Sequence, residues 1–139
     1  MTARERAVFT SFTAAVVAPH PHLPRTDDTD ALDAFENWIA QAPRLNATVL
    51  RAALTAVDLA PLATTHRTRF SKLDDTPRGQ VIDHLEHARQ PPIRQAMKAL
   101  KSIAFLCYYG DDAIMRTLGY DADANVARAR SIRAAEGRP

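Results

Sequence analysis

Five histidines and one cysteine are the side chains in this sequence best suited to metal binding or nucleophilic chemistry. His84 and His87 are three residues apart, so they share one face of a helix, where two imidazoles can ligate zinc. Their spacing differs from the HExxH pattern of zinc-binding helices, and we interpret them as part of a solvated helix face. Cys107 follows Leu100 and Ile103 at helical spacing, which predicts a buried apolar residue rather than an exposed nucleophile.

Glycine and cysteine usage excludes several kinds of cofactor site. The four glycines are Gly79, Gly110, Gly119 and Gly137. They are too far apart to form a dinucleotide-binding loop or a P-loop, in which the backbone approaches phosphate closely. A single cysteine excludes intramolecular disulfides, CxxC redox sites and all-thiolate zinc sites. We therefore expect no catalytic residue, no bound cofactor and no metal in this chain.

Tyr108, Tyr109 and Tyr120 form the densest aromatic cluster of the sequence. Tyrosine near a helix end either lies at the rim of a core or anchors a protein–protein interface. Consecutive helical residues point about 100° apart, so one of Tyr108 and Tyr109 should face away from whatever buries the other. The spacing favours the core rim and leaves the interface as the alternative.

Charge is segregated along the chain. Eighteen Lys and Arg against sixteen Asp and Glu give a formal net charge of +2. Residues 27–36 include five acidic side chains and no basic one, whereas residues 128–138 include four arginines and one glutamate. Such asymmetry fits either solvated surfaces or electrostatic steering toward a partner.

The elements that must position these residues are helices separated by prolines. Apolar side chains recur at helical spacing within residues 3–18, 32–39, 49–57, 81–85, 93–107 and 114–118. Thr2 and Glu5 fit a capping box at the first helix. In the second, Leu32, Phe35, Trp38 and Ile39 form the expected apolar face. The predicted fold is all-α: a compact single-domain bundle of five or six helices with proline-rich connectors.

The composition of the sequence predicts the connector, the helix ends and the domain boundary. Three prolines in residues 19–24 predict a stiff, extended connector, and Gly110 and Gly119 are expected to end the last two helices. Residues 1–121 form the predicted helical domain. Residues 122–139 form a basic tail, either a solvent-facing helix or a segment ordered only on a partner. No secretory signal, twin-arginine pair or apolar run of about eighteen residues is found, so we expect a cytoplasmic protein without a membrane span.

Two blocks of sequence match a known pattern. Residues 96–112, AMKALKSIAFLCYYGDD, are followed by Leu118-Gly119-Tyr120, and LAPL at 59–62 and RFSKLD at 69–74 lie upstream. In this order the blocks resemble the gluconate 2-dehydrogenase subunit 3 family over most of residues 3–121. The family pattern is an apolar helix, a Tyr-Tyr-Gly/Ser-Asp turn, a short helix and Gly-Tyr.

The resemblance implies a small accessory subunit without its own cofactor. Members of the family pair with a large FAD subunit of the glucose–methanol–choline oxidoreductase family, sometimes with a cytochrome c. Many exported members carry a twin-arginine signal, which this sequence lacks, so a cytoplasmic hetero-oligomeric complex is favoured. The implied function is a non-catalytic subunit that binds and stabilises an FAD-dependent alcohol or sugar oxidoreductase. FAD belongs to the partner.

The turn, the connector and the basic tail can each lie on another protein. The residues expected to bind the partner are Tyr108, Tyr109, Gly110, Asp111, Tyr120, Arg128 and Arg130. The alternative function is a small helical nucleic-acid-binding or regulatory protein, which the arginines favour. No helix-turn-helix with a basic recognition helix supports it, and we do not expect a nucleic acid partner. A third reading, an independent enzyme, requires a metal at His84 and His87.

Overall fold

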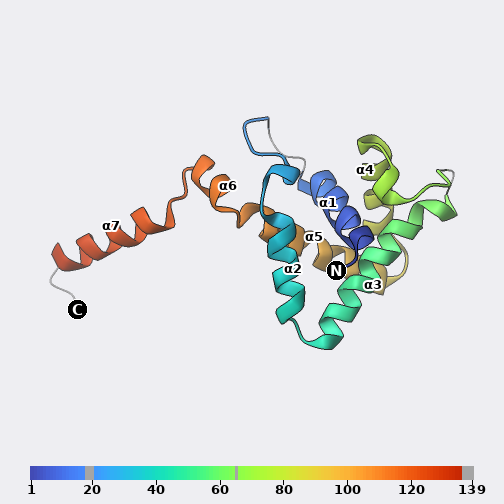
Figure 1. The fold of residues 1–139 in the computed structure, drawn as a ribbon, viewed down its shortest axis with the longest axis horizontal. Coiled ribbons are helices and arrows are strands. Elements are labelled where there is room, and N and C mark those ends of the chain that lie inside the picture. The colour runs from blue at the N-terminus through green and yellow to red at the C-terminus, as the bar shows by residue number, and fades with distance from the viewer. Residues whose placement is uncertain (18–20, 65, 136–139) are drawn as a thin grey trace.

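The computed structural model describes residues 1–17, 21–64 and 66–135 (Figure 1). These residues form seven α-helices and three short 3-10 helices, with no strand among them. The predicted all-α fold is therefore confirmed. Six of the α-helices lie within residues 1–121, and the seventh lies in the tail. Pro19 and His20 of the predicted connector, and residues 136–139 of the tail, fall outside the described residues.

Residues close to each helix end determine where the helices begin and end. They are α1 (Ala3–Val17), α2 (Ala31–Gln41), α3 (Arg44–Leu59), α4 (Asp75–Glu86), α5 (Pro91–Tyr109), α6 (Asp112–Thr117) and α7 (Ala122–Ala135), with 3-10 helices η1 (Thr26–Asp28), η2 (Ala60–Ala63) and η3 (Phe70–Lys72). At α1, the backbone N–H of Thr2 donates to Glu5 Oε2 at 2.7 Å, and the N–H of Glu5 donates to Thr2 Oγ1 at 3.2 Å. The predicted capping box is confirmed.

Helix α1 is at the centre of the core and contacts α3, α4 and α5. Its Phe9 ring stacks on Phe35 of α2, with centroids 3.8 Å apart and planes within 1°. Its Phe12 ring lies 6.4 Å from Phe70 of η3. All four rings are fully buried, and burying each stabilises the fold by about 2–3 kcal/mol. The core therefore joins the first helix to segments from the middle of the chain.

The exposure of Trp38 corrects the predicted apolar face of α2. Phe35 is fully buried against Phe9, but the Trp38 side chain is 45% exposed. Helices α2 and α3 diverge as a V whose tip is the turn at residues 42–43 (Figure 1), so little protein covers the far end of α2. The prediction of an extended connector is wrong at Pro21 and His22, which lie in a turn. The fixed φ of proline favours this conformation.

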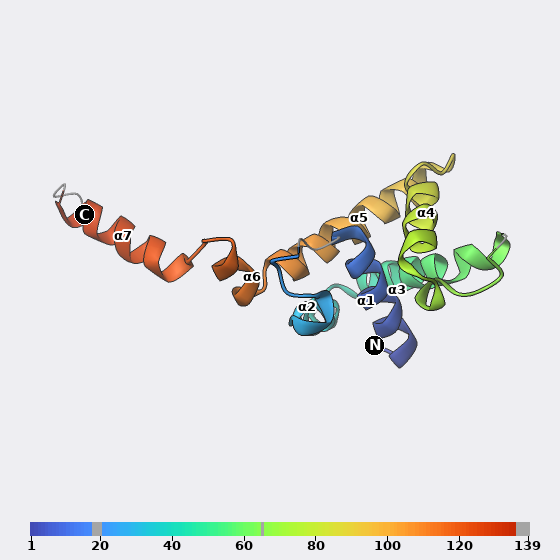
Figure 2. The same cartoon turned by 90° about the horizontal axis from the view of Figure 1, so that it is seen from above.

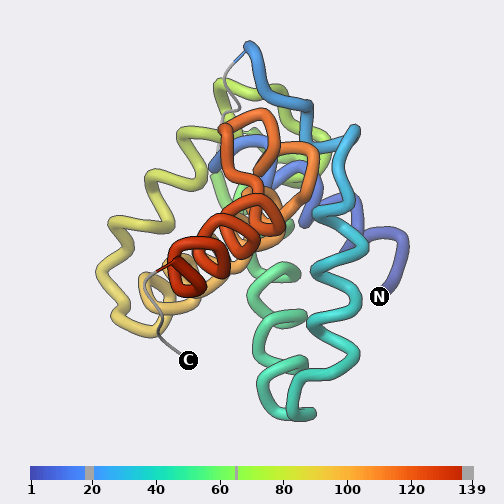
Figure 3. Tube along the Cα trace, turned by 90° about the vertical axis from the view of Figure 1, so that its left-hand side faces the viewer, coloured from blue at the N-terminus to red at the C-terminus, as the bar shows by residue number. Residues whose placement is uncertain are grey.

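The last three helices follow one another out of the bundle. Helix α5 is the longest, and α6 and α7 continue beyond its C-terminal end (Figure 2). Seen from that end, α7 projects toward the viewer, in front of the bundle (Figure 3). None of the α7 side chains is buried. Of the two alternatives for the tail, the structure has the solvent-facing helix over residues 122–135.

One helical stretch is long and apolar enough to cross a membrane by length and composition alone. It spans Arg44–Ala63 and has a mean hydropathy of 1.2. The expectation of no membrane span was drawn from uninterrupted apolar runs and stays a prediction. Its Arg51 and Asp58 form ion pairs with Glu5 and Arg4 of α1, at 2.7 and 2.8 Å. These charged contacts tie the segment to the bundle.

Candidate protein-binding site

Tyr108 belongs to the core. Its side chain is fully buried, and its hydroxyl donates a 2.6 Å hydrogen bond to the carbonyl oxygen of Pro24. This bond joins the C-terminal end of α5 to the segment that follows the predicted connector. Tyr108 therefore offers no surface to another protein, which corrects its place among the expected partner-binding residues. The physical reason is that its face of α5 packs inward.

Tyr109 points the other way, as consecutive helical residues must. Its side chain is 39% exposed and meets the Tyr108 ring edge-on, with centroids 5.1 Å apart. The Phe105 ring lies 6.1 Å away on the preceding turn. An exposed aromatic side chain held in place by a buried one is typical of an interface anchor.

Asp111 connects three elements. Its Oδ1 accepts from the backbone N–H groups of Ala113 and Ile114, at 2.8 and 3.2 Å, and so caps α6. Its Oδ2 accepts from the N–H of Asp30 at 3.0 Å. Burial alone would raise the pKa of Asp111, but these three N–H donors and the positive charge of Arg116 outweigh it, so the pKa is lowered. The carboxylate is thereby held in its charged form.

A groove of about 540 Å³ opens beside this carboxylate, between the start of α2 and the α5–α6 turn. Four aspartates line it, Asp28, Asp30, Asp111 and Asp112, with Arg116 as the only basic lining residue. Its apolar lining includes Ala34 and Leu106, and the Leu106 side chain is 73% exposed. The groove thus combines a negative rim with exposed apolar surface.

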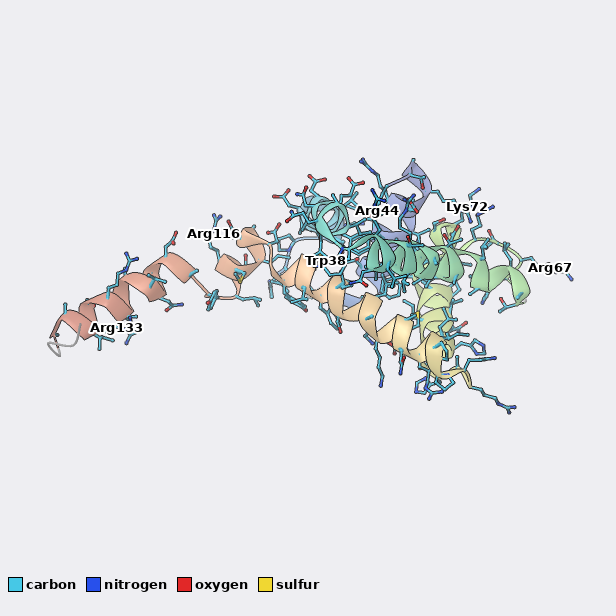
Figure 4. The ribbon with its side chains drawn as sticks, turned by 90° about the horizontal axis from the view of Figure 1, so that it is seen from below. Trp38, Arg44, Arg67, Lys72, Arg116 and Arg133 are labelled. Carbon is cyan, nitrogen blue, oxygen red and sulfur yellow. The ribbon has the colours of Figure 1, made fainter. Side chains whose placement is uncertain are left out.

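A second hollow of about 470 Å³ lies along α2. Ala34 lines both, and the second hollow also contains Asn37, Trp38, Gln41 and Pro43. The α2 residues recur at helical spacing along one face of that helix. Figure 4 shows Trp38 and, toward α7, Arg116. We call these two neighbouring hollows, which share Ala34, the α2 groove.

Gly119 and Tyr120 terminate α6. Gly119 has φ +79°, in the left-handed region that favours glycine. The N–H of Tyr120 donates to the Met115 carbonyl at 2.8 Å, and that of Gly119 to the Arg116 carbonyl at 3.0 Å. This is a Schellman motif, and it confirms Gly119 as a helix terminator. The Tyr120 side chain is 51% exposed.

Gly110 ends α5 in a different way. It is the residue after the last helical turn, with φ −80°, so it does not adopt the left-handed conformation. A Cβ at this position would lie 2.5 Å from the carbonyl oxygen of Leu106. The short distance to the Leu106 carbonyl oxygen, rather than a positive φ, explains why glycine occupies this position. Gly110 and Asp111 both line the α2 groove.

The two arginines expected to bind a partner lie on α7. Arg128 and Arg130 are exposed, and the helix leaves the bundle on the side of α6 (Figure 4). They are not brought close to Tyr109, which lies on α5. The structure therefore separates the expected set into a buried residue, an α5–α6 surface and an extended basic helix.

The candidate chemical side chains have ordinary structural surroundings. Cys107 is buried as predicted, and burial raises the pKa of its thiol to about 11. His87 Nδ1 lies 2.9 Å from the carbonyl oxygen of Asp83 on its own helix. His84 lines a small hollow with His66. Within the described residues, no group of three or more His, Cys, Asp or Glu side chains could hold a metal ion.

Asp58 is the charged residue that the sequence reasoning missed. It is fully buried on α3 and accepts from Arg4 Nε at 2.8 Å, Arg69 Nη1 at 3.2 Å and the Ser71 hydroxyl at 3.0 Å. Burial alone would raise its pKa, but these donors and the Ser71 N–H lower it. Its position four residues after Leu54 places it on the apolar stripe of α3, and this spacing indicates that it is buried.

Comparison with protein-family models, with curated proteins and with solved structures found no match.

Proposed function

We propose that this chain is a non-catalytic small subunit that binds and stabilises a large FAD-dependent alcohol or sugar oxidoreductase. The proposal starts from the resemblance to the gluconate 2-dehydrogenase subunit 3 family in residues 59–74 and 96–120. FAD and the catalytic residues belong to the partner, which is of the glucose–methanol–choline type. The proposed complex is cytoplasmic.

The exposed apolar surface at the end of α5 and on α6 is the observation that best supports this proposal. Leu106, Tyr109, Leu118 and Tyr120 are 73%, 39%, 57% and 51% exposed. Exposed patches of large apolar side chains mark protein-binding surfaces more often than isolated exposed residues do. Tyrosine is enriched among the residues that contribute most to binding.

Co-expression with the flavoprotein tests the proposal. We expect the tagged chain to hold a yellow flavoprotein through size exclusion, and we expect the flavoprotein alone to aggregate or lose flavin. Replacing Tyr109 and Tyr120 with serine should release the flavoprotein. The matched control is Leu45→Ser, because Leu45 is 74% exposed at the start of α3, away from this surface. A stable, monodisperse and fully active flavoprotein without this chain would overturn the proposal.

Nucleic acid binding is the alternative function, favoured by the exposed arginines of α7. Arg128, Arg130 and Arg133 lie on a helix that no other element covers. Phosphate contacts weaken steeply as salt rises, so a gel shift with duplex DNA at increasing ionic strength separates the two functions. A salt-dependent shift lost in Arg128→Ala/Arg130→Ala would favour the alternative.

A further inference from the structure

Helix α7 has no buried side chain in the part of the chain that the structure describes. It has 14 residues, six of them alanine. Its start is capped, because Asp121 Oδ1 accepts from the N–H of Ala124 at 2.9 Å. Helices shorter than about 12–15 residues are marginal in water by themselves, even when rich in alanine. A second surface is needed to hold α7 in place.

The surface pattern of α7 indicates what that second surface must offer. Val126, Ala129 and Ile132 share one side of the helix at spacings of three residues, and Val126 and Ile132 are 48% and 49% exposed. Asn125 and Arg133 lie on the same side, and Arg128 and Arg130 lie on its two borders. The complementary surface is therefore an acidic groove that also offers apolar area.

The α2 groove has this composition. Its acidic end carries Asp28, Asp30, Asp111 and Asp112, and its apolar floor includes Ala34 and Trp38. It follows the length of α2, whose 11 residues span about 16 Å at the helical rise, against about 21 Å for the 14 residues of α7. The groove and α7 thus carry opposite charges, both offer apolar surface, and they are similar in length.

We propose that α7 of one copy lies in the α2 groove of a second copy, and that the exchange is reciprocal. Reciprocal docking gives a closed two-fold dimer in which the same contact forms twice. The α7 arginines pair with the aspartates of the groove, and the stripe centred on Ala129 covers Trp38 and Leu106. The inference concerns the chain by itself: the contact between copies uses Leu106 and the α7 arginines, and it leaves Tyr109, Leu118 and Tyr120 for the proposed flavoprotein.

The linker favours docking onto a second copy over folding back onto the same chain. Only Tyr120 and Asp121 separate Gly119 from the start of α7. The Tyr120 N–H is bound to the Met115 carbonyl, and the Asp121 side chain caps α7. Beyond this two-residue linker α7 continues outward from α6, away from the bundle (Figure 2). Folding back would turn α7 around within the linker, whereas a second copy receives α7 in the direction it already has.

Light scattering coupled to size exclusion, over a range of protein concentrations, tests the proposal on the purified chain. We expect a mass of twice the 15.3 kDa chain that shifts toward the monomer as salt rises, because exposed ion pairs are screened. Chains with Asp28→Lys/Asp112→Lys, or with Arg128→Glu/Arg130→Glu, should be monomeric. An equimolar mixture of the two variants should recover a dimer in which both contacts pair opposite charges, one as in the unmodified chain and one with the charges reversed. One chain carrying all four changes should also dimerise.

The matched control is Asp33→Lys/Asp83→Lys, which changes the net charge equally at exposed aspartates outside the groove. It should remain dimeric. Circular dichroism of every variant shows whether the helices are retained. The single tryptophan, Trp38, adds an internal readout, because its emission should shift to longer wavelength when α7 leaves the groove.

Three results would overturn the proposal. A wild-type chain that is monomeric at every concentration excludes the second copy, including the case in which α7 folds back on its own chain. A dimer that survives Arg128→Glu/Arg130→Glu uses another surface. Monomeric variants whose charge reversals do not restore the dimer when combined exclude pairing between α7 and the groove.

Discussion

The Asp111 carboxylate accepts a hydrogen bond from the backbone N–H of Asp30, 81 residues earlier in the chain, at 3.0 Å. The same side chain caps α6 with its other oxygen. One acidic side chain thus fixes the start of α2 against the turn that joins α5 to α6. The α2 groove depends on this contact for its shape.

Replacing Asp111 tests both roles. Asp111→Ala removes the cap and the bond to Asp30, and we expect it to lower the free energy of unfolding by about 2 kcal/mol. Asp111→Asn keeps one acceptor oxygen, so it should cost about half as much. Urea denaturation followed by circular dichroism measures both. No loss in Asp111→Asn would show that the second oxygen contributes nothing, and a loss equal to that of Asp111→Ala would contradict the separate roles assigned to the two oxygens.

Tyr108→Phe removes only the hydroxyl that donates to Pro24. The Pro24 carbonyl then loses its partner in a partly buried position, so we expect a loss of about 1 kcal/mol in unfolding free energy. Tyr109→Phe is the matched control, since Tyr109 is exposed and its hydroxyl should contribute little. Thermal unfolding of the two variants provides the comparison, and identical midpoints would contradict the assigned role of Tyr108.

Asp58→Ala should be the most destabilising single change among those considered. It removes the acceptor shared by Arg4, Arg69 and Ser71 and leaves a gap beside the core. The side chains of the two arginines are 47% and 39% exposed, so they can turn to water when the carboxylate is removed. We therefore expect the free energy of unfolding to fall by about 2–3 kcal/mol, which is less than the usual loss for a broken buried ion pair. Asp83→Ala, at an exposed site, is the control for urea denaturation and should change little.

Replacing Gly119 and Gly79 with alanine should change the stability of the fold in opposite directions. Gly119→Ala forces a Cβ into the left-handed region at φ +79°, and we expect a loss of about 1 kcal/mol. Gly79→Ala lies in an exposed turn of α4 with no atom near the added Cβ, so it should stabilise the helix by about 0.5–1 kcal/mol. Midpoints of thermal unfolding that move in the same direction for both would contradict the assigned backbone roles.

Stability should fall in acid through three carboxylates. The hydrogen bond from Arg51 lowers the pKa of Glu5 from 4.5 to about 2, with Thr2 adding to it and burial opposing it. The pKa values of Asp58 and Asp111 are also lowered. Because the unfolded chain then binds protons that the folded chain does not, the unfolding free energy should decrease as pH drops from about 4.5 toward 2.

Denaturation at a series of pH values measures this effect, and Glu5→Gln should flatten part of the slope. A profile for Glu5→Gln parallel to that of the unmodified chain would rule out Glu5 as a contributor.

Local sequence determined most of the helices and their ends. The capping box of Thr2 and Glu5, the Asp111 cap and the Gly119 terminator are set by residues within a few positions of one another, and the structure has all three. The stripe of Leu50, Leu54 and Val57 on α3 was equally visible, because helical periodicity is a local property. Buried Asp58 lay on that stripe, but its three donors come from segments that only folding brings together.

What the sequence could not determine depends on how the helices pack. The angle between neighbours shows that Tyr108 and Tyr109 face apart, but only packing against Pro24 decides that Tyr108 is the buried one. Trp38 shares a periodic stripe with Phe35, yet α2 and α3 diverge and leave it exposed. The acidic stretch and the Tyr-Tyr-Gly-Asp turn each stand out in the sequence. Their meeting in one groove is a tertiary fact, because the hydrogen bond between Asp30 and Asp111 forms only when α2 packs against α5.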